Sequence, residues 1–204
     1  MIQPRNVPVL SHFDAVTEHE VQSLLMSVPA TSCPLDPIPT WLLKKLSPFI
    51  VPVICYLCNL SLQSGTFPQC LKEAIVYPRI KNPNMDPEQL KSYRPVSNLS
   101  YISKIVERVV AKRLTAHVNA SNLFPVHQSA YRARHSTETA LLSVHNDLVC
   151  SIDDGKLSVL MLLDLRSAFD TVDHEILLSL LTHRFCVRDT AYDRCRSYLM
   201  FLFL

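Results

Sequence analysis

Three aspartates follow one another closely in the last third of the sequence. Asp164 ends the apolar run LSVLMLLDL, and Asp170 and Asp173 follow it. A carboxylate at the end of a buried strand requires a partner, because an unpaired buried charge is costly. A divalent cation is one such partner, since hard cations prefer oxygen ligands held on a rigid element. The alternative is that Asp164 caps the turn after the strand and that the other two aspartates cap the next helix.

Basic residues gather in an earlier region, around two short extended runs. Residues 74–80 show the alternating pattern of a strand, with β-branched and aromatic side chains, and Tyr93–Ser97 is a second extended run. A polar segment with two prolines, 81–91, joins them. The pattern predicts a β-hairpin with a long loop, and its basic residues are Lys72, Arg79, Lys81, Lys91 and Arg94.

Helices are expected around these two regions. A capping box over Thr17–Glu20 starts the first helix, and apolar residues at helical spacing mark most of the others. The continuous apolar run 157–165 has the length and composition of a strand buried on both faces. Helices around a few strands predict an α+β fold. The expected helices span 17–28, 40–46, 51–64 (ended by Gly65), 98–120, 136–152 and 173–185, and a last one begins near residue 190.

The composition is that of a folded, mildly basic protein. The chain has 204 residues, of which 48% are hydrophobic and 19% are charged, with a net charge of +2. That balance argues against disorder and does not locate a nucleic-acid surface. The chain has only two glycines, which excludes the glycine-rich phosphate loops of Rossmann and P-loop proteins.

The sequence predicts an intracellular protein without a membrane span. Residues 1–10 lack the pattern of a signal peptide. The longest apolar stretch, 46–62, is interrupted by Pro48, Pro52 and Asn59 and falls short of the roughly 20 apolar residues that a span requires. Cys55 and Cys58 form a CxxC without a second pair, so we expect core cysteines and not zinc ligands.

Three blocks of the sequence, in order, resemble those of one enzyme family. Residues 163–174 read LDLRSAFDTVDH, which is similar to motif A of LINE-like reverse transcriptases, LDLSxAFDTVDH. Residues 93–99, YRPVSNL, resemble the YRPISNL block, and residues 128–141, QSAYRARHSTETAL, resemble QSGFRxGHSTETAL. The chain is thereby identified as part of a reverse transcriptase from a non-long-terminal-repeat retrotransposon, with the similarity covering about residues 13–199.

The resemblance implies a partial right-hand polymerase. The expected parts are a helical segment at 1–72, the fingers at 73–155 and a partial palm at 156–204, with an apolar palm strand. Motif A implies that Asp164 is catalytic and that, with the Leu165 carbonyl, it holds two Mg²⁺ ions for phosphoryl transfer. Phe169 would lie under the incoming sugar, unless it is ordinary core packing. Asp170 and Asp173 are assigned to structure, and His174 receives no catalytic role.

The other two blocks imply contacts with substrates. Arg94, with Lys81, would neutralise the triphosphate of a dNTP, the alternative being solvated surface charge. Gln128 and Arg132 would contact the backbone of an RNA template and a DNA primer. No obligate protein partner is expected. The remaining basic residues of the helix at 98–120 are expected on a solvated face: Lys104, Arg108, Lys112 and Arg113.

The sequence also departs from the family pattern. Ala130 and Arg134 replace glycines, which risks distortion of that loop, and Arg166 stands where a small residue is usual. No paired-aspartate block (motif C) follows Leu199, and the residues after it, 200–204, fit no family pattern. We therefore expect this chain alone to be inactive or nearly so, either a polymerase fragment or an inactive retrotransposon remnant that binds nucleic acid weakly. A domesticated interaction protein has no positive support. An unpaired palm strand also predicts poor solubility.

Overall fold

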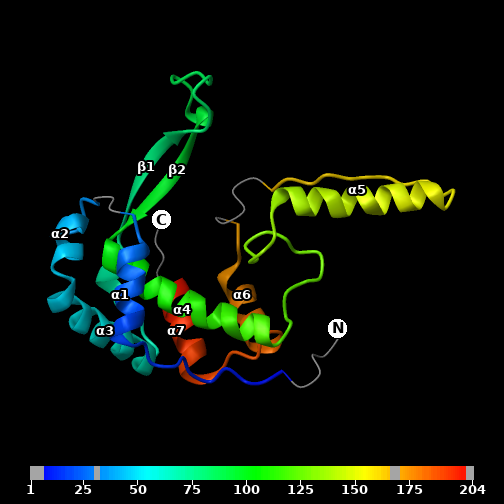
Figure 1. The fold of residues 1–204 in the computed structure, drawn as a ribbon. Coiled ribbons are helices and arrows are strands. Elements are labelled where there is room, and N and C mark those ends of the chain that lie inside the picture. The colour runs from blue at the N-terminus through cyan, green and yellow to red at the C-terminus, as the bar shows by residue number, and fades with distance from the viewer. Residues whose placement is uncertain (1–6, 30–32, 166–170, 201–204) are drawn as a thin grey trace. The chain divides into compact units, whose positions relative to one another are not determined.

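A computed structural model describes residues 7–29, 33–165 and 171–200. The elements lie in the order α1, α2, α3, β1, β2, α4, α5, α6, α7 (Figure 1), with short 3₁₀ turns before each strand. Their bounds are α1 Glu18–Ser27, α2 Thr40–Lys45, α3 Ser47–Ser64, β1 Ala74–Ile80, β2 Tyr93–Leu99, α4 Tyr101–Ala120, α5 Thr137–Asp153, α6 His174–His183 and α7 Asp189–Leu199.

The predicted α+β composition and the hairpin are confirmed. Helix α3 begins four residues earlier than expected and, as expected, contains Pro52. Pro48 occupies the first helical turn, where a missing N–H has no helical partner in any case. Gly65 ends the helix in the left-handed conformation, with φ 64°. It also lies against α7, since a Cβ there would come within 3.0 Å of the Cβ of Asp193.

The chain divides into two compact units. Unit 1 comprises Met1–Ser121 and His174–Leu204, and unit 2 comprises Asn122–Asp173. Unit 1 therefore contains the hairpin and every helix except α5.

The core of unit 1 forms where α1, α3, α4, α6 and α7 pack on one another. The buried face of α4 is the one that the periodicity predicted, with Ile105, Val106 and Val109 all at most 1% exposed. Tyr101, at the start of α4, donates its hydroxyl proton to the Leu25 carbonyl of α1. The shared apolar face thus explains why these helices form one body.

The first described residues of the chain join the last helix. Leu10 forms a parallel bridge with Val187, and the Ser11 carbonyl accepts hydrogen bonds from the Ala191 amide (3.1 Å) and the Thr190 hydroxyl (3.1 Å). Unit 1 is therefore closed by contacts between residues at opposite ends of the sequence.

Glu20 links α1 to α4. Thr17 caps α1 by accepting from the Glu20 amide at 3.2 Å, as predicted, but the Glu20 carboxylate pairs instead with Arg113 (3.1 Å) and Lys112 (3.0 Å). Arg113 also donates to the carbonyls of Asp14 and Ala15. The expectation that Arg113 lies on a solvated face was wrong, because its guanidinium is held between two segments and its side chain is 13% exposed.

Helix α3 has one buried face and one exposed apolar face. By length and composition it is the one helix in the described parts of the chain that could cross a membrane. Four of its residues nevertheless pack in the core of unit 1: Val51, Ile54, Cys58 and Leu62. Core helices of soluble proteins can be equally long and equally apolar, so length and composition do not identify a membrane span. The absence of a membrane span thus stays a prediction. The exposed face carries Phe49, Val53, Tyr56 and Leu60.

Cys55 and Cys58 are buried and free, as expected for core cysteines. The Cys55 thiol donates to the Val16 carbonyl at 3.3 Å. Burial raises the pKa of the Cys58 thiol to about 11, which keeps it protonated and a poor metal ligand at neutral pH. Both cysteines therefore act as small core residues.

Unit 2 consists of a loop, α5 and an extended segment. Ser136 and Thr139 form a capping box at the start of α5, as the predicted helix start at Ser136 implies. The predicted buried strand at 157–165 is not formed. These residues have no strand pairing, and Leu157, Val159 and Leu162 are at least 85% exposed. A strand requires a neighbour for its backbone groups, and the sheet within the described residues contains only β1 and β2.

Candidate functional site

The β1–β2 hairpin carries the basic residues of the first candidate site. Its strands pair antiparallel, with Ala74 opposite Leu99 and Ile80 opposite Tyr93. Most of its side chains are exposed on both faces. Pro78 lies opposite Pro95; prolines interrupt the donor row of an open strand edge and discourage further strand pairing. The hairpin is thus a two-stranded ribbon that is open to ligands and protected from extension.

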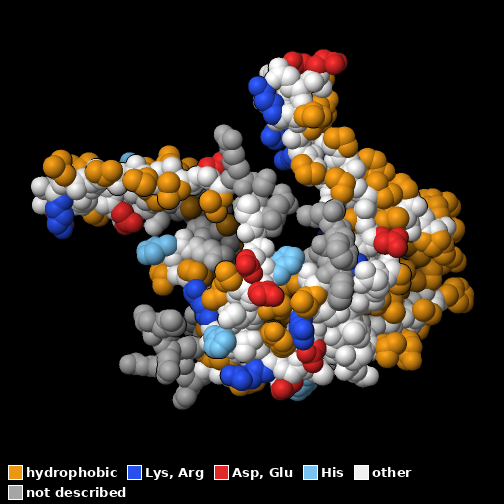
Figure 2. Space-filling model, turned by 180° about the vertical axis from the view of Figure 1, so that it is seen from behind, with side chains coloured by type: hydrophobic (Ala, Val, Ile, Leu, Met, Phe, Trp, Pro, Cys, Tyr) orange, Lys and Arg blue, Asp and Glu red, His pale blue; other side chains and the backbone are white. Residues whose placement is uncertain are grey.

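Charge is unevenly distributed on this ribbon. Figure 2 shows the Lys and Arg side chains gathered along one edge of the hairpin and hydrophobic side chains along the other. Arg94 is exposed and lies directly opposite Arg79. Arg79 is one of the basic residues expected in the hairpin region, and neither its type nor its position in the sequence predicts a role at the site. Strand alternation together with the register would have found it, because cross-strand partners share a face.

Two of the three lysines assigned to the hairpin region, Lys72 and Lys81, are held by backbone carbonyls. Lys81 follows β1, and its ammonium donates to the Lys91 carbonyl at 2.9 Å. The ammonium of Lys72 instead binds the carbonyls of Ser197 and Met200 beyond the hairpin. Lys72 therefore joins the hairpin base to the end of α7 and does not belong to the basic edge.

Asp164 and Leu165 lie on the extended segment of unit 2, and both are exposed. A carboxylate and a backbone carbonyl are hard oxygen donors of the kind that Mg²⁺ prefers. The parts of the chain that the structure describes contain no group of three or more acidic, histidine or cysteine side chains that could hold a metal ion. The donor types fit Mg²⁺, whereas their number does not complete a two-ion site.

Two residues of the predicted site region cannot be placed. Phe169 and Asp170 lie outside the described residues. Asp173 directly precedes α6, which begins at His174. That position agrees with its assignment to the start of a helix, where the dipole favours an acidic side chain.

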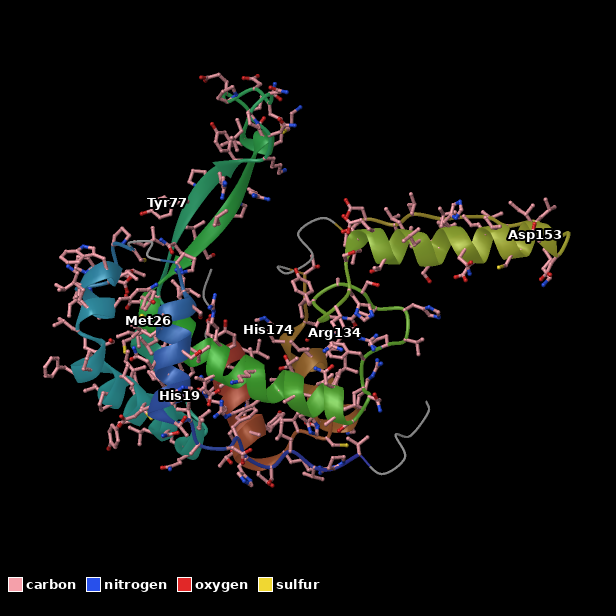
Figure 3. All side chains as sticks on the ribbon, viewed as in Figure 1. His19, Met26, Tyr77, Arg134, Asp153 and His174 are labelled. Atoms are coloured by element: carbon pink, nitrogen blue, oxygen red, sulfur yellow. The ribbon has the colours of Figure 1, made fainter. Side chains whose placement is uncertain are left out.

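Gln128 and Arg132 lie in the loop 122–136 of unit 2. The Gln128 amide donates to the Ala130 carbonyl at 3.2 Å, and the Arg132 guanidinium lies 5.6 Å from the centre of the Phe124 ring. Their template and primer contacts stay a prediction. Arg134, labelled in Figure 3, adopts φ 63°. This left-handed conformation is the one that glycine adopts without steric cost, so the expected strain at this position has a structural basis.

A polar cluster in the core of unit 1 was not foreseen. The Tyr198 hydroxyl donates to the Glu107 carboxylate at 2.7 Å, and burial raises the pKa of Glu107. Arg194, 1% exposed, donates its Nε proton to the Ser61 hydroxyl at 2.9 Å and lies 4.6 Å from the centre of the Phe67 ring. Burial lowers its pKa to about 10.

This cluster borders a largely apolar cavity of about 430 Å³ between α4, α6 and α7. Glu107 and Arg194 contribute to its wall, and the rest is mostly leucine and valine. Glu107 is therefore a carboxylate of α4 that faces the interior. Its partners lie about ninety positions later in the sequence, so helical periodicity alone does not reveal them.

Comparison with known proteins identifies the family. Residues 80–202 match the family model described as reverse transcriptase (RNA-dependent DNA polymerase). That region contains Lys81, Arg94, Gln128, Arg132 and Asp164. The family implies nucleic-acid substrates and dependence on a divalent metal.

Individual relatives agree with the family model. The chain is 30% identical over 161 residues (78% of the chain) to the probable RNA-directed DNA polymerase from transposon BS of Drosophila melanogaster. It is 30% identical over 165 residues (80%) to the RNA-directed DNA polymerase from mobile element jockey, and 33% identical over 132 residues (65%) to the probable polymerase from transposon X-element, both of the same organism. It spans 14% to 18% of the length of these relatives. The chain therefore belongs to the reverse transcriptase family, in its non-long-terminal-repeat (LINE-like) retrotransposon branch.

Proposed function

We propose that this chain supplies the nucleotide-binding hairpin and the motif A aspartate of an RNA-directed DNA polymerase. Template-primed addition of dNTPs would proceed by two-metal phosphoryl transfer once further carboxylates complete the site. The observation that carries the proposal is that the family match, residues 80–202, includes both Arg94 on β2 of the hairpin and Asp164.

Each part of the chain would have a defined task. Arg94, exposed on an open ribbon, would bind the triphosphate, since guanidinium groups bind phosphate oxygens bidentately. Asp164 and the Leu165 carbonyl would each offer a hard oxygen donor to Mg²⁺. Gln128 and Arg132, on the loop before α5, would contact template and primer. Phe169 would contact the sugar. The fingers at 73–155 and the partial palm at 156–204 are the corresponding lobes.

The proposal is tested by primer extension in a complete polymerase. A chimera would carry residues 13–199 in place of the aligned part of the jockey polymerase, with an RNA template, a DNA primer and Mg²⁺. Asp164→Asn is expected to reduce extension by at least about 100-fold, because it removes a charge that holds the metal ions. Asp154→Asn, at the exposed end of α5 in the same unit, is the matched control and is expected to retain activity. Equal activity of the Asp164→Asn and parent chimeras would refute the assignment.

The second candidate is an inactive remnant with weak nucleic-acid binding. The specific observation that favours it is that the described residues do not complete a metal site. Under this alternative neither the chain nor the chimera extends a primer, while the isolated chain binds an RNA–DNA hybrid weakly and with strong salt dependence. An intracellular location is proposed for either form.

A further inference from the structure

Arg79 and Arg94 form a like-charged pair across the hairpin. They are direct partners in the β1–β2 register, and the Cβ atoms of such partners lie roughly 4.5–5.5 Å apart. Both side chains are exposed. Like charges directly opposite each other destabilise a strand pair, so this position has a cost unless an anion lies between the two groups.

The hairpin itself provides no such anion. Every residue from 73 to 100 is described, and among the described residues no acidic side chain lies within ion-pair distance of either arginine. The acidic residues Asp86 and Glu88 lie in the loop that joins the strands. The Asp86 carboxylate accepts from the Glu88 amide and the Gln89 side chain. The charge of the arginine pair is therefore left for a ligand.

The geometry defines the chemistry of that ligand. Two adjacent guanidinium groups present parallel rows of donors that match phosphate oxygens. A polynucleotide strand carries one charge per phosphate along its length, whereas a polyphosphate concentrates several charges on directly linked phosphoryl groups. The close spacing of Arg79 and Arg94 favours the second kind of ligand.

We infer that Arg79 and Arg94 together bind the polyphosphate chain of a nucleoside triphosphate, with Arg79 as a second guanidinium contact. This inference rests on the proposed function and adds to it, because that function assigns the triphosphate to Arg94 alone and the family resemblance adds only Lys81. Lys81 lies outside the strand pairing, and one of its ammonium protons is directed to the Lys91 carbonyl. Arg79 is the cation that the register places beside Arg94.

The test uses the whole chain and inorganic tripolyphosphate in magnesium-free buffer, with isothermal titration calorimetry. Arg79→Gln and Arg94→Gln are each expected to raise the Kd about 10-fold or more, since hydrogen bonds to charged groups are among the strong ones. Arg108→Gln is the matched control, because Arg108 is an exposed arginine on α4 outside the hairpin. It is expected to leave the Kd within twofold of the parent value.

Thermal stability without ligand provides a second readout. Removing Arg79 removes the repulsion, so the Tm of the Arg79→Gln variant is expected to equal or exceed that of the parent. The stabilisation that tripolyphosphate adds to the parent should shrink in this variant. A loss of binding with an unchanged or higher Tm cannot be attributed to misfolding.

Three outcomes would overturn the inference. If Arg94→Gln weakens binding and Arg79→Gln does not, Arg79 has no role, while the proposed function stands. If neither variant differs from Arg108→Gln, the nucleotide-binding role of the hairpin also fails. If Arg79→Gln weakens binding of a ten-nucleotide single-stranded RNA without a triphosphate, and leaves tripolyphosphate binding unchanged, the ligand is a strand backbone.

Discussion

At the scale of single residues, two side chains occupy positions that disfavour them. Arg134 adopts φ 63° where the family resemblance leads us to expect glycine. Glu107 faces the interior of unit 1, where its carboxylate has the Tyr198 hydroxyl as its hydrogen-bond donor. Neither residue is explained by its own helix or loop pattern, and each gives a direct test of the local structure.

Arg134→Gly is expected to stabilise the loop 122–136. A non-glycine residue in the left-handed region costs roughly 1–2 kcal/mol. The substitution removes this cost, but the greater conformational freedom of glycine in the unfolded chain offsets part of the stabilisation. The net effect should be a stabilisation of about 0.5 kcal/mol, seen as slower amide hydrogen exchange in this loop. Arg132→Gly, at a position without positive φ, should instead destabilise the loop and speed its amide exchange. Faster exchange in the Arg134→Gly loop would show that the left-handed conformation is not the source of strain.

Glu107→Gln should change how the stability of unit 1 depends on pH. Burial raises the pKa of Glu107 in the folded state, so the folded protein binds this proton more tightly than the unfolded chain does. The resulting stabilisation is fully present below the unfolded pKa of about 4.3 and is lost as pH rises through the folded pKa. The parent should lose stability relative to the variant over this interval, by at most about 1.4 kcal/mol per pH unit.

Urea unfolding at a series of pH values from 4 to 8 measures this difference. The comparison with the variant is essential, because Glu20 changes the pH dependence of stability in the opposite direction. Burial raises the pKa of Glu20, but the hydrogen bonds from Arg113 and Lys112 outweigh it and lower the pKa overall. Parallel pH profiles for parent and Glu107→Gln would contradict the prediction.

At the scale of elements, long-range pairs determine how the helices of unit 1 meet. Figure 3 labels His19 and Met26 on α1, the helix that Glu20 joins to α4. The pair Arg113–Glu20 is largely shielded from water, whereas Lys112 is 65% exposed. The two cations bind the same carboxylate and should therefore contribute very different free energies.

Arg113→Ala is expected to lower the free energy of unfolding of unit 1 by about 2–3 kcal/mol, because it removes a partly buried ion pair and three hydrogen bonds to carbonyls. Lys112→Ala should lower it by less than about 0.5 kcal/mol, as is usual for an exposed ion pair. Denaturant unfolding of both variants provides the comparison. Similar losses would mean that the burial of Arg113 has no energetic consequence.

Sequence patterns predicted those elements whose causes are local. The hairpin is evident in the alternation of β1 and the prolines of its loop, and α5 in its cap at Ser136. The role of Arg113 could not be predicted, because its acceptors at Asp14, Ala15 and Glu20 lie more than ninety positions away. The apolar run 157–165 has the length and composition of a strand. A strand also requires a neighbour, and the pattern of a single segment says nothing about whether a neighbour is present.

The candidate site shows the same division. The resemblance to motif A and to the YRPVSNL block singles out Asp164 and Arg94, and their roles stay a prediction. The partnership of Arg79 with Arg94 required the strand register. How many carboxylates can bind one metal ion depends on which side chains lie close together in three dimensions. Spacing in the sequence does not show this.

At the scale of the whole molecule, unit 2 has little interior. Helix α5 has no buried residues, and the extended segment after it exposes a series of large apolar side chains. Unpaired apolar segments with high strand propensity associate with copies of themselves. Self-association of the chain is the expected consequence, in agreement with the predicted poor solubility.

The double variant Leu160→Lys, Leu162→Lys should therefore remain in solution at higher concentration than the parent. Two like charges on an exposed segment oppose strand pairing between molecules, and no buried contact is lost, since these leucines are 54% and 85% exposed. Leu141→Lys, Leu142→Lys on α5 is the control with equal charge, and it should help less because helical backbone groups are already paired. Light scattering against concentration measures the effect. A monodisperse parent that melts cooperatively would disprove the premise.

The closure of unit 1 by Leu10, Ser11 and α7 has a consequence for synthesis on the ribosome. The amide and hydroxyl groups that bind the Ser11 carbonyl belong to Ala191 and Thr190, respectively, so Ser11 has no partner there until residues 190 and 191 have emerged. At about 5–20 residues per second, the intervening residues of unit 2, 122–173, alone delay completion by roughly 3 to 10 seconds. During that interval Leu10 and Ser11 lack their partners, and a ribosome stalled within residues 122–173 would release a chain in which these contacts cannot form.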